Sequence, residues 1–345
     1  MLHVDQLSSV SSTAGPAEIR AKFDEYGYVV VRGLLDPAAD LQPVRDEYAA
    51  LLDRLAREWH QRGELSSDFA GLSFEARLTA VVAETGDRIY DHFRIFFNPP
   101  SATTADSPIH TGPAIFGLLT NPRVLDVVEC LIGPEIYLNP VNVARIKVPE
   151  RYLPQGRQYH IGLTAAWWHQ DQGVFSDDIS DIDMLTVWLP LTDASKEMGC
   201  LQVVPGSHKG ELSVHCHSSD PHKVGIPELL LGNGRHYVEM KAGDVHFHHR
   251  RLQHGSLRNV SDRLRFSFDL RYQPLEQVVG QSAGVPADLK IPGFIARSRK
   301  QPQTELRDWQ GWARLQEETR RLFMAIDWEN NPPRSQFTAD HRYCI

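Results

Sequence analysis

Several signatures of membrane, secreted and nucleic-acid-binding proteins are missing from this 345-residue chain. It has no run of about 18 apolar residues, so we expect no membrane-spanning helix. Residues 1–6 include neither a basic start nor an apolar segment, which argues against a secretory signal. The formal net charge of −8 argues against general affinity for nucleic acid or acidic membranes. These absences predict a cytoplasmic protein with no nucleic-acid or membrane partner.

Cysteine is also scarce. The chain has four cysteines, Cys130, Cys200, Cys216 and Cys344, and no CxxC pair. Four are too few for a disulfide framework in a chain of this length. We therefore expect reduced thiols and no zinc site built on them.

What is present indicates a globular protein with a hydrophobic core, because 41% of the residues are hydrophobic and 23% are charged. The length suits one domain, 1–345, with additions. Within it we expect a mobile N-terminus (1–15), a mostly helical support (16–133), a β-rich core (134–275) and a helical C-terminal extension (276–345).

The first half of the chain alternates helical patterns with short apolar runs. Apolar spacing and Pro or Asn near the starts predict helices over 17–26, 36–62, 74–84 and 122–133. Aromatic and β-branched residues predict strands over 28–33 and 92–97. Four aromatic residues of this half, Phe93, Phe96, Phe97 and Phe116, are expected to pack in the core.

After Gly133 the pattern changes to short strands separated by turn signals. The expected strands cover 136–148, 163–169, 184–191, 200–204, 237–240, 245–249 and 264–272. Many short strands without long intervening helices favour an all-β barrel or jelly roll. Residues 305–326 return to helical spacing, and this helix either braces the barrel or forms a dimer contact.

One pair of residues near the middle of the chain has the chemistry of a metal site. His169 and Asp171 stand two apart, so in an extended chain both side chains leave the same face. An imidazole and a carboxylate make two thirds of a 2-His-1-carboxylate ligand set for Fe(II). The third ligand is open among four histidines of one window, which are His246, His248, His249 and His254.

Several stretches resemble the phytanoyl-CoA dioxygenase family. They are 28–36, the His169-Gln170-Asp171 motif, 198–210, and 254–272 with its His-Gly-Ser start. The resemblance covers residues 17–275. It implies an Fe(II)- and 2-oxoglutarate-dependent oxygenase, mainly β with flanking helices, whose core is a double-stranded β-helix (a cupin-like jelly roll).

The resemblance also implies individual roles. His169, Asp171 and His254 would bind iron. In the family pattern an arginine that holds the far carboxylate of 2-oxoglutarate lies eleven positions after the last ligand. Eleven after His254 is Arg265, whereas eleven after the other three candidates gives Leu257, Asn259 and Val260. Ser267, Trp188 and Gln170 would help to bind the co-substrate.

The implied reaction consumes 2-oxoglutarate and O₂, releases succinate and CO₂, and oxidises a C–H bond of a small molecule. Hydroxylation is the default outcome, and desaturation, cyclisation and epoxidation are alternative outcomes of the same chemistry. Because no compact basic patch stands out, we expect a natural-product or amino-acid-type metabolite rather than an acyl-CoA. The alternative is a non-catalytic, cupin-like module that binds a metal and a 2-oxoacid.

The substrate pocket is expected to be shaped by 90–115, 207–236 and 290–345, and a homodimer would form through the C-terminal helix. Other histidines and arginines are expected to be structural or solvated. In that group are His246 and His248 as packing or ligand-orienting residues, His208 as a turn residue, His215, His217 and His222 in loops, Arg271 at a strand end, and the basic residues 297–300 and 320–321.

Overall fold

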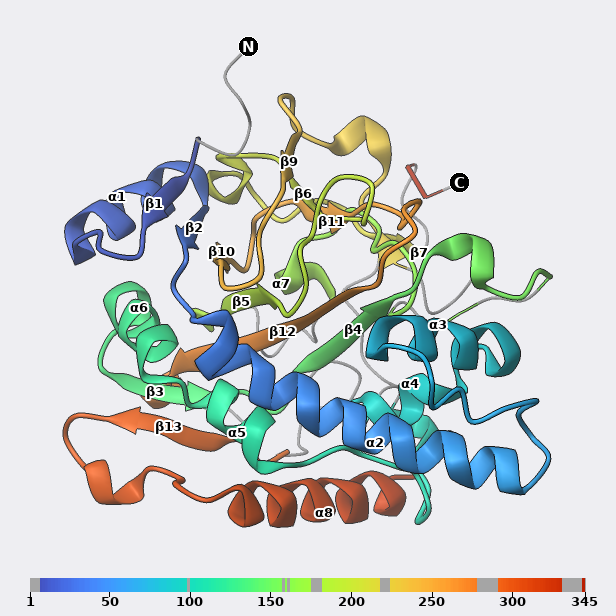
Figure 1. Cartoon of the computed structure of the whole chain (residues 1–345). Coiled ribbons are helices and arrows are strands. Elements are labelled where there is room, and N and C mark those ends of the chain that lie inside the picture. The colour runs from blue at the N-terminus through green and yellow to red at the C-terminus, as the bar shows by residue number, and fades with distance from the viewer. Residues whose placement is uncertain are drawn as a thin grey trace.

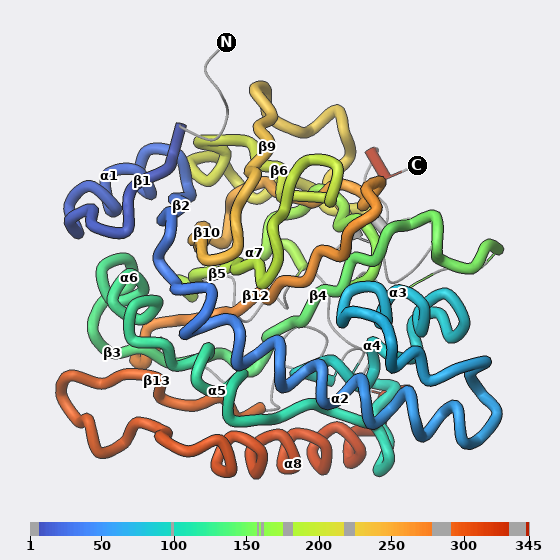
Figure 2. Tube along the Cα trace, in the orientation of Figure 1, coloured from blue at the N-terminus to red at the C-terminus, as the bar shows by residue number. Residues whose placement is uncertain are grey.

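Two β-sheets face each other at the centre of the fold, and helices cover the outer side of the larger sheet (Figure 1). The structure is a computed structural model. It describes residues 7–97, 100–156, 159, 162–174, 182–217, 224–277, 291–330 and 343–344. The path of the chain can be followed in Figure 2. No helix within these ranges is long and apolar enough to cross a membrane.

Among the described residues the large sheet has eight strands. Their order across the sheet is β1 (Ser9–Ser11), β2 (Tyr28–Arg32), β10 (Val245–His249), β5 (Leu185–Pro190), β12 (Arg265–Pro274), β3 (Glu135–Leu138) and β13 (Phe294–Ser298), and β4 (Val143–Lys147) also pairs with β12. All pairings are antiparallel except β1 with β2.

The small sheet has the order β11 (His254–Ser256), β6 (Leu201–Val203) and β9 (His236–Val238). A separate two-stranded ribbon joins β7 (Cys216–His217) to β8 (Val224–Gly225). Apolar residues of the small sheet, such as Leu201 and Val203, pack against Tyr28, Val30 and Trp188 of the large sheet. The space between the sheets is therefore partly filled by core side chains.

Strand β12 shows how the large sheet divides its two faces. Because side chains alternate along a strand, one face of β12 carries apolar residues and the other carries polar ones. The apolar set is Phe266, Phe268, Leu270 and Tyr272, which join the main core, and the polar set is Arg265, Ser267, Asp269 and Arg271. Both sets are buried, so the polar face is enclosed between the sheets rather than exposed to water.

The helices begin and end where the sequence provides caps. Pro16 starts α1, and Gly27 ends it at a φ of 78° with its N–H bonded to the Phe23 carbonyl. Asn121 caps α6 by accepting from the Arg123 N–H. The helices are α1 (Pro16–Tyr26), α2 (Gln42–Gln61), α3 (Phe74–Thr85), α4 (Arg88–Phe93), α5 (Pro113–Leu119), α6 (Pro122–Ile132), α7 (Asp171–Val174) and α8 (Trp309–Ala325). Shorter turns are a π-helical one at Pro37–Leu41 and 3₁₀ turns at Pro100–Ala102, Glu150–Tyr152, Ser207–Lys209, Glu228–Leu230, Leu275–Gln277 and Pro302–Thr304.

Helix α8 lies along the same side of the large sheet as α2 and α5 (Figure 1). Trp312 packs against Phe116 with a ring-centroid distance of 6.4 Å. Phe323 is fully buried and lies 6.0 Å from Phe96 and 6.3 Å from Phe97. The apolar face of α8 is therefore used to brace its own chain, as one of the two sequence-based readings expected.

The expected jelly roll with flanking helices is confirmed, but some elements were predicted wrongly. The run 92–97 is not a strand, because α4 ends at Phe93 and an irregular segment follows. A short apolar run fits a buried helix as well as a strand, so its pattern could not decide. Residues 163–169 form no strand beyond one bridge at His169. Strand β1 lies inside the expected mobile N-terminus, and β13 lies inside the expected helical extension.

We predict that Phe323→Ala lowers the free energy of unfolding by about 3–5 kcal/mol, because it leaves a cavity where α8 meets the rest of the chain. The neighbouring Met324 is 49% exposed, so Met324→Ala is the matched control. It should change stability by no more than about 0.5 kcal/mol. Urea unfolding measures both values, and equal effects of the two substitutions would contradict this packing.

Candidate metal and co-substrate site

Three side chains gather at the end of the small sheet. His169, Asp171 and His254 are buried, and each offers a ligand atom within 4.8 Å of the others. Two backbone hydrogen bonds hold the two histidines together. The His169 N–H donates to the His254 carbonyl at 2.8 Å, and the His254 N–H donates to the His169 carbonyl at 2.9 Å. Asp171 follows at the first residue of the single-turn helix α7. The structure thus brings together the three residues that the family resemblance implied.

Both imidazoles have one nitrogen fixed by a backbone carbonyl. Nδ1 of His169 lies 2.7 Å from the Trp167 carbonyl oxygen, and Nδ1 of His254 lies 2.9 Å from that of Leu252. A carbonyl oxygen only accepts, so each Nδ1 carries the proton and each Nε2 keeps a free lone pair. Burial lowers the pKa of both histidines, so both rings are neutral near pH 7. This is the form that binds a metal.

Asp171 is an ionised carboxylate whose two oxygens have different surroundings. Oδ1 lies 3.8 Å from Nε2 of His169 and 3.5 Å from Nη2 of Arg271. Oδ2 accepts from the Thr186 hydroxyl and lies 3.2 Å from Nε2 of His248. Burial alone would raise the pKa of Asp171. Arg271 and the imidazoles of His248 and His254 instead hold this pKa well below its usual range.

Arg265 has hydrogen-bond donors that no group in the described ranges uses. It is fully buried, and its Nη1 donates to Oγ of Ser267 at 2.6 Å. Its Nε and Nη2, and Nε1 of Trp188, have no hydrogen-bond partner within the described part of the chain. Buried donors without a partner cost about 1–3 kcal/mol each, so a bound group that accepts from them would be stabilised. Burial lowers the pKa of Arg265 to about 9, which leaves the guanidinium charged at neutral pH.

The two imidazoles and the arginine share one cavity. Its wall includes His169 and His254 together with Trp188 and Arg265. Arg145 also lines it and is paired with Asp269, whose Oδ2 lies 2.5 Å from the arginine Nε. A metal held by the three clustered groups would therefore share a cavity with an arginine whose donors need an anionic partner.

Gln170 lies between two of the clustered residues but faces away from the cavity. Its Nε2 donates to the Arg251 carbonyl at 2.8 Å, and its Oε1 accepts from the Ser213 N–H at 2.7 Å. Its backbone N–H donates to Nε2 of His215 at 3.0 Å. The amide of Gln170 therefore fastens the loop, and its expected contact with the co-substrate stays a prediction.

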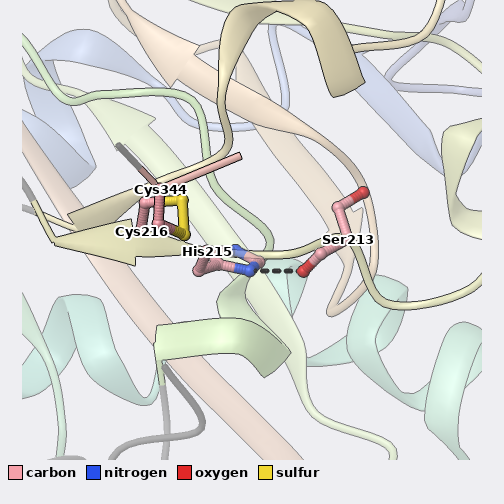
Figure 3. Close-up of a disulfide and its surroundings, with 4 residues drawn as sticks. All are labelled: Ser213, His215, Cys216 and Cys344. Atoms are coloured by element: carbon pink, nitrogen blue, oxygen red, sulfur yellow. Dashed lines mark hydrogen bonds between the residues drawn. A yellow bond between two sulfur atoms is a disulfide. The ribbon is translucent and has the colours of Figure 1, made fainter. Parts of the chain in front are cut away.

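His215 lies in a loop, as expected, but it is buried. It is 2% exposed, and its Nδ1 donates to the Ser213 carbonyl at 2.7 Å. Figure 3 marks this hydrogen bond with a dashed line. Burial lowers its pKa to about 4, so its bare Nε2 can accept from Gln170. The next residue, Cys216, forms a disulfide with Cys344 (Figure 3). The expectation of four reduced thiols is wrong, and only Cys130 and Cys200 are free.

Further expectations for single residues have mixed outcomes. Arg271 donates to the Val141 carbonyl at 3.0 Å but also contacts Asp171, so it is more than a strand-end arginine. Arg297 is not simply solvated, because it pairs with Asp126 and Glu129 of α6. His222 lies outside the described residues, as do 98–99, 218–223, 290, 331–342 and 345 of the segments expected to shape the pocket.

The chain is similar to known proteins over most of its length. The family model described as Phytanoyl-CoA dioxygenase (PhyH) matches residues 23–267. The peroxisomal phytanoyl-CoA dioxygenase of Bos taurus is 26% identical over 253 residues, which are 72% of this chain and 65% of that protein. The chain therefore matches slightly less than two thirds of that relative's length.

Two further likenesses extend over more of the chain. The ectoine dioxygenase of Sphingopyxis alaskensis is 25% identical over 293 residues, which cover 80% of this chain and 81% of that protein. The solved apo structure of the non-heme monooxygenase ThoJ has a TM-score of 0.50 and 17% sequence identity, and the match covers 88% of this chain and 98% of that one. The structural likeness supports the fold.

We predict that reducing the Cys216–Cys344 disulfide lowers the free energy of unfolding by about 2–4 kcal/mol. The intact disulfide closes a long loop in the unfolded chain, and reduction removes this constraint. Cys344→Ser should be destabilised to a similar extent and should not respond to dithiothreitol. Urea unfolding with and without the reductant measures this. A variant as stable as the oxidised wild type, or four titratable thiols in the wild type, would contradict the pairing.

Proposed function

Because this chain belongs to the phytanoyl-CoA dioxygenase family, we propose that it is an Fe(II)- and 2-oxoglutarate-dependent dioxygenase. It oxidises a C–H bond of a small molecule and releases succinate and CO₂. The observation that carries the proposal is the cluster of three metal-type donors. Two of them, His169 and His254, line a cavity with Arg265, which has donors without a partner in the described part of the chain.

The metal-binding atoms are Nε2 of His169, Oδ1 of Asp171 and Nε2 of His254. The tautomers that their backbone partners impose support this choice, since both Nε2 atoms keep a lone pair. Two imidazoles and one carboxylate suit Fe(II) and leave positions open for other ligands. When bound there, iron would supply the activation of O₂, and this chain's own residues would position the reactants.

Arg265, Ser267 and Trp188 bind 2-oxoglutarate in this proposal. The planar guanidinium can donate two parallel, charge-assisted hydrogen bonds to the far carboxylate. Its Nε and Nη2 and the indole N–H of Trp188 are the donors without a described partner, which supports this assignment. Because Arg265 is fully buried, the co-substrate would be held away from bulk water.

The primary substrate in this proposal is a natural-product or amino-acid-type metabolite, and hydroxylation is the default outcome. The similarity to an ectoine dioxygenase over 81% of that protein supports a metabolite of this type. The match to the mammalian enzyme spans only 65% of its length and gives less support for an acyl-CoA. Product analysis by mass spectrometry would separate hydroxylation from desaturation, cyclisation or epoxidation.

We also propose that residues 1–345 form a single oxygenase domain that acts in the cytoplasm without a nucleic-acid partner, which its net charge of −8 supports. The Cys216–Cys344 disulfide is unusual for that location, where thiols are kept reduced. A homodimer through α8 stays a prediction. Trp312 and Phe323 pack within the chain, so a dimer contact would have to use other residues of this helix. Light scattering measures the oligomeric state directly.

We predict that the wild type converts 2-oxoglutarate to succinate only with Fe(II), and that candidate substrates stimulate this turnover. His169→Ala and Asp171→Ala should lose roughly 100-fold or more of it, because each removes a metal ligand. His60→Ala, at the exposed end of α2, is the control and should keep full activity. If all three variants match the wild type, the metal site is wrong.

Arg265→Ala should weaken 2-oxoglutarate binding to the Mn(II)-loaded protein about 100-fold, since it removes charge-assisted hydrogen bonds worth about 3 kcal/mol. Arg265→Lys keeps the charge but not the planar fork, and it should recover only part of the affinity. Calorimetry without O₂ measures binding apart from turnover. If the wild type binds 2-oxoglutarate tightly but turns it over with none of the substrates tested, the non-catalytic module is favoured.

A further inference from the structure

We propose that His248 is a positioning residue, held in turn by His246, that binds one oxygen of Asp171 so that only the other oxygen faces the metal. This inference rests on the proposed metal site and adds two residues that the proposed function does not use. The residues concerned are on β10, a strand of the large sheet that contributes none of the three clustered donors.

The alternation of β10 places His246 and His248 on the inner face of the large sheet and His249 on the outer one. In the sheet register His248 lies opposite Thr186 of β5, and His246 lies opposite Trp188. His248 is 2% exposed and His246 is fully buried. The cross-strand pair of His248 and Thr186 therefore forms one small wall of the site.

Both members of this pair contact the same oxygen of Asp171. Oδ2 accepts from the Thr186 hydroxyl and from Nε2 of His248, which is 3.2 Å away. Oδ1 is the oxygen that lies near Nε2 of His169, at 3.8 Å. A carboxylate with two donors on one oxygen is held against rotation. The metal would then meet Oδ1 alone, and Asp171 would be a ligand through one oxygen.

Hydrogen bonds link the two histidines to Asp171. A carboxylate only accepts, so Nε2 of His248 donates to Oδ2. Nδ1 of His248 lies 3.3 Å from Nδ1 of His246, within hydrogen-bond distance. Nε2 of His246 is buried and has no hydrogen-bond partner in the described ranges. Tyr28 stacks on His246 with a centroid distance of 5.3 Å and fixes its ring.

The three-residue chain therefore runs from His246 through His248 to Asp171, with one hydrogen bond at each step. Partners of metal ligands usually fix the ligand's orientation, and their removal weakens metal binding about 10–100-fold. His248 contacts a carboxylate ligand, whereas the two ligand imidazoles are oriented by backbone carbonyls of Trp167 and Leu252. Asp171 is thus the ligand whose orientation depends on other side chains.

The test is the affinity of the full-length, metal-free protein for Mn(II), measured by competition with a fluorescent chelator and without 2-oxoglutarate. His248→Leu should weaken Mn(II) binding about 10–100-fold. His248→Gln, whose amide nitrogen can replace the Nε2 donor, should recover most of the affinity. Thr186→Val removes the second donor from Oδ2 with little change of volume and should weaken binding several-fold.

His249→Gln is the matched control, because this histidine is on the same strand but packs outward against Phe23 and His208. It should bind Mn(II) as the wild type does, and melting curves identify any variant that does not fold. If His248→Leu and Thr186→Val both bind Mn(II) as tightly as the wild type, the inference is overturned while the proposed function stands. If Gln does not rescue what Leu loses, the role of His248 is only structural and the inference is likewise overturned. A wild type that binds no Mn(II) would contradict the proposed function itself.

Discussion

Two backbone hydrogen bonds between His169 and His254 hold the site together. They join His254, on the edge strand β11 of the small sheet, to His169 in the loop before α7. They thereby bring together two imidazoles that are far apart in the sequence. Gly255 makes this possible, because a Cβ there would lie 2.9 Å from the Ala166 carbonyl oxygen. The loop is fastened further by Gln170, whose side chain is bonded to Arg251 and Ser213. Asp171 then starts a single helical turn at a fixed distance from the bridge.

The inner face of the large sheet supplies the charge that the site needs. Arg265, Arg145 and Arg271 all project from β12 or β4 into the space between the sheets. Burying a charge is expensive unless it is paired. Arg145 is paired with Asp269 and Arg271 with Asp171, whereas Arg265 keeps donors for a bound anion. The same alternation that puts Phe266 and Phe268 in the core therefore places the binding groups opposite them.

The sequence allowed the β-rich core and the ligand set to be predicted, the latter because the spacing from His254 to Arg265 matched a family pattern. The local conformation was less predictable. A strand was expected over 163–169, but only a bridge forms at His169. Asp171 begins a helical turn instead of continuing an extended chain. Both features depend on contacts with distant segments. The Cys216–Cys344 pair could not be found from spacing, because 128 positions separate the two residues. The spacing of His246 and His248 puts both on one strand face, and a packing or ligand-orienting role was expected for them. The sequence could not show that His248 contacts Asp171.

The central claim is that the three clustered donors and Arg265 bind iron and 2-oxoglutarate in one cavity. The most direct test is X-ray diffraction at the iron absorption edge from anaerobic crystals grown with Fe(II) and 2-oxoglutarate. The account predicts one strong anomalous peak bounded by Nε2 of His169, Oδ1 of Asp171 and Nε2 of His254, with a 2-oxoglutarate carboxylate on Arg265. An iron peak elsewhere, or a co-substrate that does not reach Arg265, would contradict it.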